Sequence, residues 1–135
     1  MILKIEGTVV SGIGNGRKYV SLPIYTDILS RILGSKPYYG TLNIALSNLS
    51  VDELIKTCTP GIVNDIVLGS MTYGGFYYWY SKILERRNGV SEKVVVIRPF
   101  KSKNPRNVVE VISDKCLREY LGLVDGDVVT IEFKC

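Results

Sequence analysis

A glycine-rich loop near the N-terminus has residue types and spacing that could do chemistry. Gly12, Gly14 and Gly16 alternate with other residues, and Arg17 and Lys18 follow them. Glycine has no Cβ and permits positive φ, so the N–H groups of this loop could surround an anion such as a phosphate. A plain turn between two strands is the alternative, because the loop lacks the Gly-Lys-Ser/Thr ending of a P-loop and a strand is expected to follow it.

Two neutral oxygen donors stand two residues apart in the next candidate segment. Leu42, Ile44 and Leu46 alternate toward a core, so Thr41 and Asn43 share the opposite face of the strand. Their side-chain oxygens could hold a magnesium ion that keeps most of its waters and bridges to phosphate oxygens. A solvated strand face would explain the same pattern.

Glu110 is the most unusual carboxylate in the sequence. It lies between Val108 and Ile112 on one face of a β-branched run. A carboxylate in such surroundings is costly to bury unless it accepts hydrogen bonds, so either this face is wet or Glu110 has a partner. At the edge of a cleft it could accept the N–H of a heterocycle. An ordinary exposed glutamate remains the alternative.

Two further segments have open interpretations. The stretch from Arg98 to Arg106 is the densest positive segment of the chain, either a contact for phosphate or nucleic acid or a solvated loop. The aromatic block Phe76–Tyr80 could stack on a planar ligand, or it could be a strand whose rings pack in the core.

Composition narrows the possible chemistry. The 135 residues suffice for one domain with its own core, and the net charge of +4 with a pI near 9.0 favours anionic ligands. There is no histidine, which excludes Ser-His and Cys-His nucleophiles and imidazole-ligated zinc. Catalysis would therefore rest on carboxylates, cations, backbone dipoles or a metal held by oxygen.

The cysteines and the hydropathy suggest the compartment. Cys58, Cys116 and Cys135 are odd in number and widely spaced, so we expect reduced thiols. The sequence shows neither an apolar run of membrane-spanning length nor a leader, so a cytoplasmic protein is expected.

The elements that must position these residues are mostly short strands. Helices are expected at 24–33, opened by Pro23 and stopped by Gly34, and at 51–57 behind a Ser50–Glu53 capping box. Strands are expected at 2–10, 18–22, 41–46, 62–68, 76–84, 93–97, 108–112 and 128–133, with a hairpin turn at 88–89. Such a mainly β chain, with two or three short helices, typically forms a small barrel.

A third helix is expected near the C-terminus. Ser113 or Asp114 would cap a helix from Lys115 to Leu121, and Gly122 would stop it. Lys115 in its first turn and Arg118 one turn later would then reach the same side.

Several segments together resemble the archaeal CTP-dependent riboflavin kinases. They are Gly12–Arg17, the Gly-Thr-Leu-Asn of 40–43, the Val-Glu-Val-Ile around Glu110, and the closing Lys-Cys-Leu-Arg, Leu-Gly-Leu and Asp-Gly-Asp. Their order and separation match the family from Ile5 to Phe133. The resemblance implies one kinase domain over 1–135, folded as a six-stranded cradle-loop barrel. It also implies that CTP phosphorylates the 5′-hydroxyl of riboflavin, giving FMN and CDP.

The resemblance also assigns roles by position. Glu110 would touch the flavin together with Ser102 and could serve as the catalytic base, while Thr41 and Asn43 would bind Mg²⁺. The residues that would hold the nucleotide are Gly12, Ile13, Gly14, Asn15, Gly16, Arg17, Lys115, Cys116, Leu117 and Arg118. The expected partners are the small molecules CTP and riboflavin, bound by a monomer that contacts neither a membrane nor nucleic acid.

The chain departs from the family pattern in two places. The family commonly has threonine where Ser102 stands, a change that keeps the hydroxyl. It also tends to have Ala-Pro-Met-Lys where this chain has Ser113-Asp114-Lys115-Cys116. Because of the second departure, we expect the segment around Lys115 to contact the nucleotide through its backbone rather than through the Lys115 side chain.

Two other functions remain open at this point. Cradle-loop barrels include DNA-binding regulators, in which the 98–106 loop would contact the DNA backbone. Against this, such regulators need neither the glycine loop nor the Gly-Thr-Leu-Asn strand. A flavin- or nucleotide-binding protein without turnover is the third possibility, and formation of FMN distinguishes the kinase from both.

Overall fold

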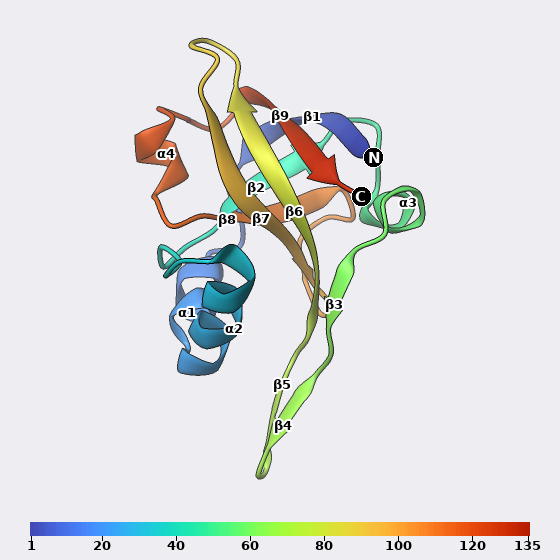
Figure 1. Ribbon diagram of the computed structural model, residues 1–135, viewed down its shortest axis with the longest axis vertical. Coiled ribbons are helices and arrows are strands. Elements are labelled where there is room, and N and C mark those ends of the chain that lie inside the picture. Colours follow the sequence, from blue (N-terminus) through green and yellow to red (C-terminus); the bar gives the residue numbers. More distant parts are fainter.

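A closed antiparallel β-barrel forms the body of the protein, as the computed structural model of residues 1–135 shows (Figure 1). Its six strands are β1 (Ile2–Val10), β2 (Leu42–Leu46), β6 (Phe76–Glu85), β7 (Ser91–Pro99), β8 (Val108–Ile112) and β9 (Val128–Lys134). Their order is β6-β7-β8-β2-β1-β9, and β9 pairs with β6 to close the ring. The expected six-stranded barrel is confirmed.

The remaining strands and the helices surround this barrel. β3 (Gly61–Val63) extends the sheet beside β6, and β4 (Ile66–Leu68) with β5 (Met71–Tyr73) forms a hairpin that projects from the body (Figure 1). The helices are α1 (Gly16–Ser21), α2 (Pro23–Leu33), α3 (Val51–Thr57) and α4 (Leu117–Tyr120). None of these helices has the length and apolar character needed to cross a membrane.

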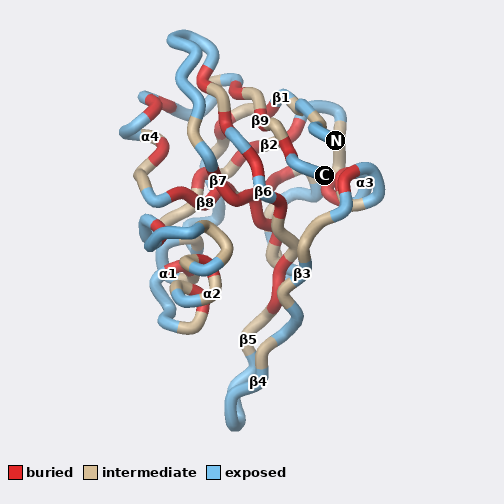
Figure 2. The backbone as a smooth tube through the Cα atoms, in the orientation of Figure 1, coloured by how far each residue is buried: buried red, intermediate tan, exposed pale blue.

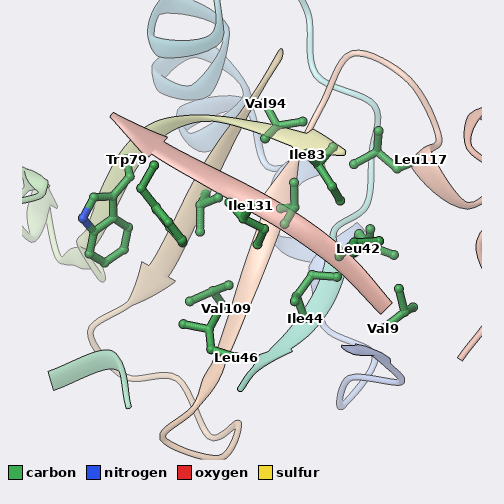
Figure 3. Close-up of a cluster of buried hydrophobic side chains, with 14 of the residues drawn as sticks. Val9, Leu42, Ile44, Leu46, Trp79, Ile83, Val94, Val109, Leu117 and Ile131 are labelled. Atoms are coloured by element: carbon green, nitrogen blue, oxygen red, sulfur yellow. The ribbon is translucent and has the colours of Figure 1, made fainter. Parts of the chain in front are cut away.

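Apolar side chains pack on both sides of the barrel wall. The larger cluster fills the interior and includes Ile44, Trp79 and Ile131 (Figure 3). The smaller one lies between the outer wall and α1 and α2, and includes Val20 and Leu29. Because the β-strand period is two, successive residues of β7 alternate between the two clusters, which explains its unbroken apolar run. In Figure 2 the buried residues concentrate in the barrel, whereas the tip of the β4–β5 hairpin is exposed.

Several local predictions are confirmed. Pro23 occupies the first turn of α2, and Gly34 ends that helix with a φ of 85°. At α3 the Ser50 and Glu53 side chains exchange hydrogen bonds with each other's backbone N–H, as a capping box requires. Gly89 adopts a φ of 69° in the turn between β6 and β7.

The predicted strand at 18–22 is wrong, because helix α1 follows the glycine loop. Val20 is fully buried in the outer cluster, and its carbonyl accepts a hydrogen bond from the Thr26 hydroxyl of α2 at 2.6 Å. Packing against α2 therefore overrides the weak strand propensity of this short segment. The number of helices is accordingly four, not two or three.

Two other boundaries differ from prediction. The expected strand at 62–68 is divided into β3 and β4, because the Asp65 carboxylate turns back to accept the Gly75 N–H at 2.7 Å. The last helix is short: α4 begins at Leu117, and Cys116, rather than Ser113 or Asp114, is its N-cap. Lys115 therefore precedes the helix instead of lying in its first turn.

The cysteine prediction is wrong for two of the three residues. Cys58 and Cys135 form a disulfide that ties the C-terminal residue to the end of α3, and only Cys116 is a free thiol. Their separation of 77 residues hides this pairing from any local pattern. The Cys135 N–H also donates to the Met1 carbonyl at 2.9 Å, so both chain termini lie at this position.

The aromatic block Phe76–Tyr80 belongs to the packing of the barrel. Phe76 is buried in the outer cluster and Trp79 in the interior, where its indole N–H donates to the Cys58 carbonyl at 2.8 Å. No residue of the block lines the cleft described below. Of its two interpretations, core packing is therefore the one that holds.

Candidate active site

One cleft of about 640 Å³ brings all of the predicted site residues together. It lies against the outer face of β2 and β8, under the glycine loop, and is completed by the 99–104 loop and the segment before α4. The predicted residues that line it are Gly12, Ile13, Gly14, Asn15, Gly16, Arg17, Thr41, Asn43, Ser102, Glu110, Lys115, Cys116, Leu117 and Arg118. Its volume suits small-molecule ligands.

The glycine loop packs directly on the two neutral donors of β2. A Cβ added to Gly12 would lie 2.3 Å from the Asn43 amide nitrogen, and one added to Gly16 would lie 2.4 Å from the Thr41 hydroxyl oxygen. A side chain at either position would therefore have to displace Asn43 or Thr41, so glycine is favoured here by close approach and not by a turn alone. An anion bound by this backbone would sit beside Thr41 and Asn43.

Glu110 faces the same group from the neighbouring strand. It is opposite Asn43 in the β2–β8 register, and its carboxylate accepts a hydrogen bond from the Thr41 hydroxyl at 3.0 Å. Burial raises the pKa of Glu110, while the Thr41 hydrogen bond and the charge of Arg98 oppose that rise. Of the alternatives open from the sequence, Glu110 therefore has a hydrogen-bond partner, and its raised pKa makes it a better proton acceptor when ionised.

Replacing Glu110 with glutamine is expected to raise the melting temperature at pH 7 by roughly 2–5 °C. The raised pKa means that ionised Glu110 opposes folding at a pH above that pKa, and glutamine removes this penalty. The penalty of the wild type disappears as the pH falls through the raised pKa to below 4.5, so the two proteins should converge. Thermal unfolding of both at pH 7 and pH 4 measures this, and an equal difference at the two values would contradict it.

The two cations beside the glycine loop, Lys115 and Arg118, are both engaged in ion pairs. Arg118 donates to the Asp125 carboxylate at 2.7 Å, and the Ser11 hydroxyl donates to the same carboxylate, so the glycine loop and α4 are joined there. The Lys115 ammonium already pairs with Glu92 at 2.9 Å and Asp114 at 3.0 Å. Lys115 and Arg118 therefore line one cleft without forming a pair on one helix face.

Sequence reasoning missed the aromatic end of the cleft. The rings of Tyr19 and Tyr25 stack with centroids 4.1 Å apart, and the Tyr25 hydroxyl donates to the Gly74 carbonyl at 2.7 Å. The Tyr19 hydroxyl is buried without a hydrogen-bond partner. Tyr38 and Tyr39 also line the cleft. Tyr19 could have been found only if the segment behind the glycine loop had been recognised as helical.

A divalent cation would have to be held largely by neutral oxygens. No cluster of three or more His, Cys, Asp or Glu side chains that could hold a metal is present. Thr41 and Asn43, with the loop backbone packed on them, offer two such oxygens beside a place for phosphate. That donor set fits Mg²⁺, which keeps several waters and binds through few protein ligands plus substrate phosphates.

Fold and site together define a small antiparallel barrel protein with a glycine-rich loop, neutral oxygen donors and a half-buried carboxylate in one cleft. These are the components that phosphoryl transfer requires. Residues 9–133 match the family model CTP-dep_RFKase, described as "Domain of unknown function DUF120". The chain therefore belongs to the CTP-dependent riboflavin kinase family, and the protein is a kinase, that is, a phosphotransferase.

Individual relatives agree with this membership. The chain is 38% identical to a riboflavin kinase of Sulfurisphaera tokodaii, across 97% of this chain and 95% of the relative. It is 35% identical to a riboflavin kinase of Methanococcus aeolicus, across 97% and 98%. A riboflavin kinase of Pyrobaculum aerophilum is 37% identical, and there the match covers 96% of this chain but 60% of the relative.

Proposed function

We propose that residues 1–135 form a single kinase domain that transfers the γ-phosphate of CTP to the 5′-hydroxyl of riboflavin, giving FMN and CDP. The observation that carries this proposal is the close approach of the glycine loop to Thr41 and Asn43. Thr41 in turn donates a hydrogen bond to Glu110. The proposed phosphate site would thereby adjoin a half-buried proton acceptor. The names of the relatives supply riboflavin as the acceptor, and the family name supplies CTP as the donor.

The nucleotide is assigned to the wall formed by the glycine loop and the segment from Lys115 to Arg118. Backbone N–H groups of the loop would donate to the phosphate oxygens, and Arg17 and Arg118 would add positive charge. Since Lys115 is already paired with two carboxylates, its backbone contributes more here than its ammonium. Asp125 keeps Arg118 at the loop through the 2.7 Å ion pair.

Riboflavin is assigned to the opposite end, beside Ser102, Glu110 and the stacked tyrosines. The Ser102 oxygen accepts the Asn104 N–H at 3.2 Å, which leaves its own O–H free to donate to the flavin. The rings of Tyr19 and Tyr25 offer an apolar wall for a planar ligand. The proposal thus separates a charged nucleotide end from an aromatic flavin end.

In the transfer step, the 5′-oxygen of riboflavin attacks the γ-phosphorus and the bond to the β-phosphate oxygen breaks. Glu110 would accept the hydroxyl proton, and the Thr41 hydrogen bond would hold its carboxylate in place. The loop N–H groups would stabilise the charge that develops on the transferred group. Mg²⁺ bound through Thr41 and Asn43 would neutralise phosphate charge.

The deciding experiment incubates the purified protein with riboflavin, Mg²⁺ and each of CTP, ATP, GTP and UTP, and measures FMN by chromatography. FMN is expected with CTP and at least tenfold less with the other donors. FMN at equal rates with all four would remove the CTP preference, and no FMN with any donor would overturn the kinase. The DNA-binding alternative has lost support, because the chain belongs to the riboflavin kinase family. In the basic loop, Arg98 is buried, and Lys101 and Lys103 line the cleft.

A further inference from the structure

Arg98 is a buried arginine that holds the loop between β7 and β8. It is 3% exposed at the end of β7. One terminal nitrogen donates to the Pro105 carbonyl at 2.9 Å and to the Val108 carbonyl at 2.8 Å, and the other donates to the Asn104 carbonyl at 3.1 Å. Two carbonyls of the loop and the carbonyl of Val108, the first residue of β8, therefore converge on a single guanidinium.

No carboxylate forms an ion pair with this guanidinium. Arg98 takes part in none of the ion pairs of the molecule, and its Nε has no hydrogen-bond partner. A buried guanidinium without an ion-paired carboxylate is costly. These three carbonyls solvate it, and the more distant charges of Glu110 and Asp52 also favour its charged form. In return, the path of the loop depends on the Arg98 side chain.

The loop that Arg98 holds forms one wall of the flavin end of the cleft, while Arg98 itself lies outside the cleft. Pro99 and residues 101–104 line the cleft, and Arg98 lines a separate small cavity of about 180 Å³ on the other side of the loop. Two bonds connect Arg98 to Ser102: Arg98 fixes the Asn104 carbonyl, and the Asn104 N–H fixes the Ser102 oxygen at 3.2 Å.

We propose that Arg98 is a positioning residue for riboflavin. Its hydrogen bonds to the loop carbonyls fix the position of the Ser102 hydroxyl from the side of the loop that faces away from the cleft. This inference rests on the proposed function, because it takes riboflavin to bind beside Ser102. It predicts that a side chain with no contact to either substrate controls the affinity for one of them. The nucleotide wall, from Gly12 to Arg17 and near Arg118, shares no hydrogen bond with Arg98.

Lysine cannot replace arginine in this role. Its ammonium is a point charge on a flexible stem, whereas the planar guanidinium presents donors in a fixed fork that matches carbonyls in different directions. Arg98→Lys keeps the charge and removes the fork. Arg106→Lys is the matched control, since Arg106 lies on the same loop but its side chain is exposed and pairs with Asp52 at the surface.

The experiment compares riboflavin and CTP affinities of the wild type, R98K and R106K, by quenching of flavin fluorescence and by calorimetry with Mg²⁺. We expect R98K to weaken riboflavin binding about tenfold or more, which corresponds to the loss of about one to two hydrogen bonds. CTP affinity should stay within twofold, and R106K should resemble the wild type for both ligands. Unchanged riboflavin affinity in R98K, or an equal loss for the two ligands, would overturn the inference.

A double-mutant cycle tests whether the effect passes through Ser102. Ser102→Ala should weaken riboflavin binding about fivefold in the wild type but less than twofold in R98K, because the hydroxyl is already misplaced there. Additive losses would overturn the proposed route. If R98K shows no cooperative thermal transition, the same comparisons are made with Arg98→Gln, which removes the buried charge and keeps an amide donor.

Failure of this inference can be told apart from failure of the proposed function. If the wild type itself binds no riboflavin, the assignment of the flavin fails, and the inference fails with it. If the wild type binds riboflavin and forms FMN while R98K binds riboflavin equally well, only the role of Arg98 fails.

Discussion

Glu110→Gln is expected to lower the turnover number for FMN formation by roughly a hundredfold to a thousandfold, the usual contribution of a general base. Glutamine keeps the shape of the side chain and an oxygen that can accept the Thr41 hydrogen bond of 3.0 Å, but it cannot take up a proton. The affinity for riboflavin should change by less than tenfold. Steady-state kinetics combined with direct flavin binding separates the two quantities.

The matched control is Glu6→Gln, the same substitution at an exposed glutamate whose surface ion pair with Arg86 measures 3.3 Å. Its turnover number should equal that of the wild type, because an exposed pair of this kind contributes little. If E110Q turned over at the wild-type rate, Glu110 could not be the base. A loss confined to riboflavin affinity would then identify it as a residue that only orients the flavin.

Gly12→Ala is expected to weaken CTP binding by about a hundredfold, with a small change in melting temperature. The new Cβ would meet the Asn43 amide at 2.3 Å, so either the loop lifts from β2 or Asn43 turns away. Both outcomes separate the phosphate-binding backbone from a proposed magnesium ligand, and misplacing such groups by about 1 Å can cost a hundredfold. Calorimetry with CTP and Mg²⁺ measures the affinity.

A clash of the same size outside the cleft provides the control. A Cβ on Gly7 would lie 2.4 Å from the Ile44 methyl group within the barrel wall, so Gly7→Ala should lower the melting temperature and leave the CTP affinity of the folded protein unchanged. Gly14 offers a contrast within the loop itself, because its added Cβ would meet nothing within 4 Å and the strain would come only from its φ of +85°. If G12A lost as much stability as G7A and kept the CTP affinity of the wild type, Gly12 would contribute only to the fold.

Local sequence patterns predicted much of the barrel because they record interactions between near neighbours. The capping box of Ser50 and Glu53 and the φ of Gly34 need only a few adjacent residues, so both were predictable. The alternation in β2 likewise reports which face meets the core, and Leu42, Ile44 and Leu46 are indeed buried. The sequence pattern also singled out Glu110, but it left open whether this carboxylate has a partner or lies on a solvated face.

Patterns failed wherever the deciding contact came from a distant part of the chain. Val20 lies in a helix because it packs against α2 and the barrel wall. The sequence of residues 18–22 contains no signal of that packing. The disulfide likewise joins residues 77 positions apart. The stacked pair of Tyr19 and Tyr25 depends on helix α1, which contains Tyr19, and was missed for the same reason.

By itself the sequence determined most of the barrel strands and the exclusion of histidine chemistry, since these follow from short-range periodicity and from composition. The six-stranded barrel and cleft residues such as Ser102 and Cys116 were predicted from the resemblance to the kinase family. Only the tertiary structure decided which groups meet. It packs the backbone of Gly12 and Gly16 against Asn43 and Thr41, joins Thr41 to Glu110, and leaves the Arg98 guanidinium to the carbonyls of its own loop. Such contacts depend on closing the barrel and on the register of its strands. These bring together residues as distant as Thr41 and Glu110, which are 69 positions apart and which no local pattern relates.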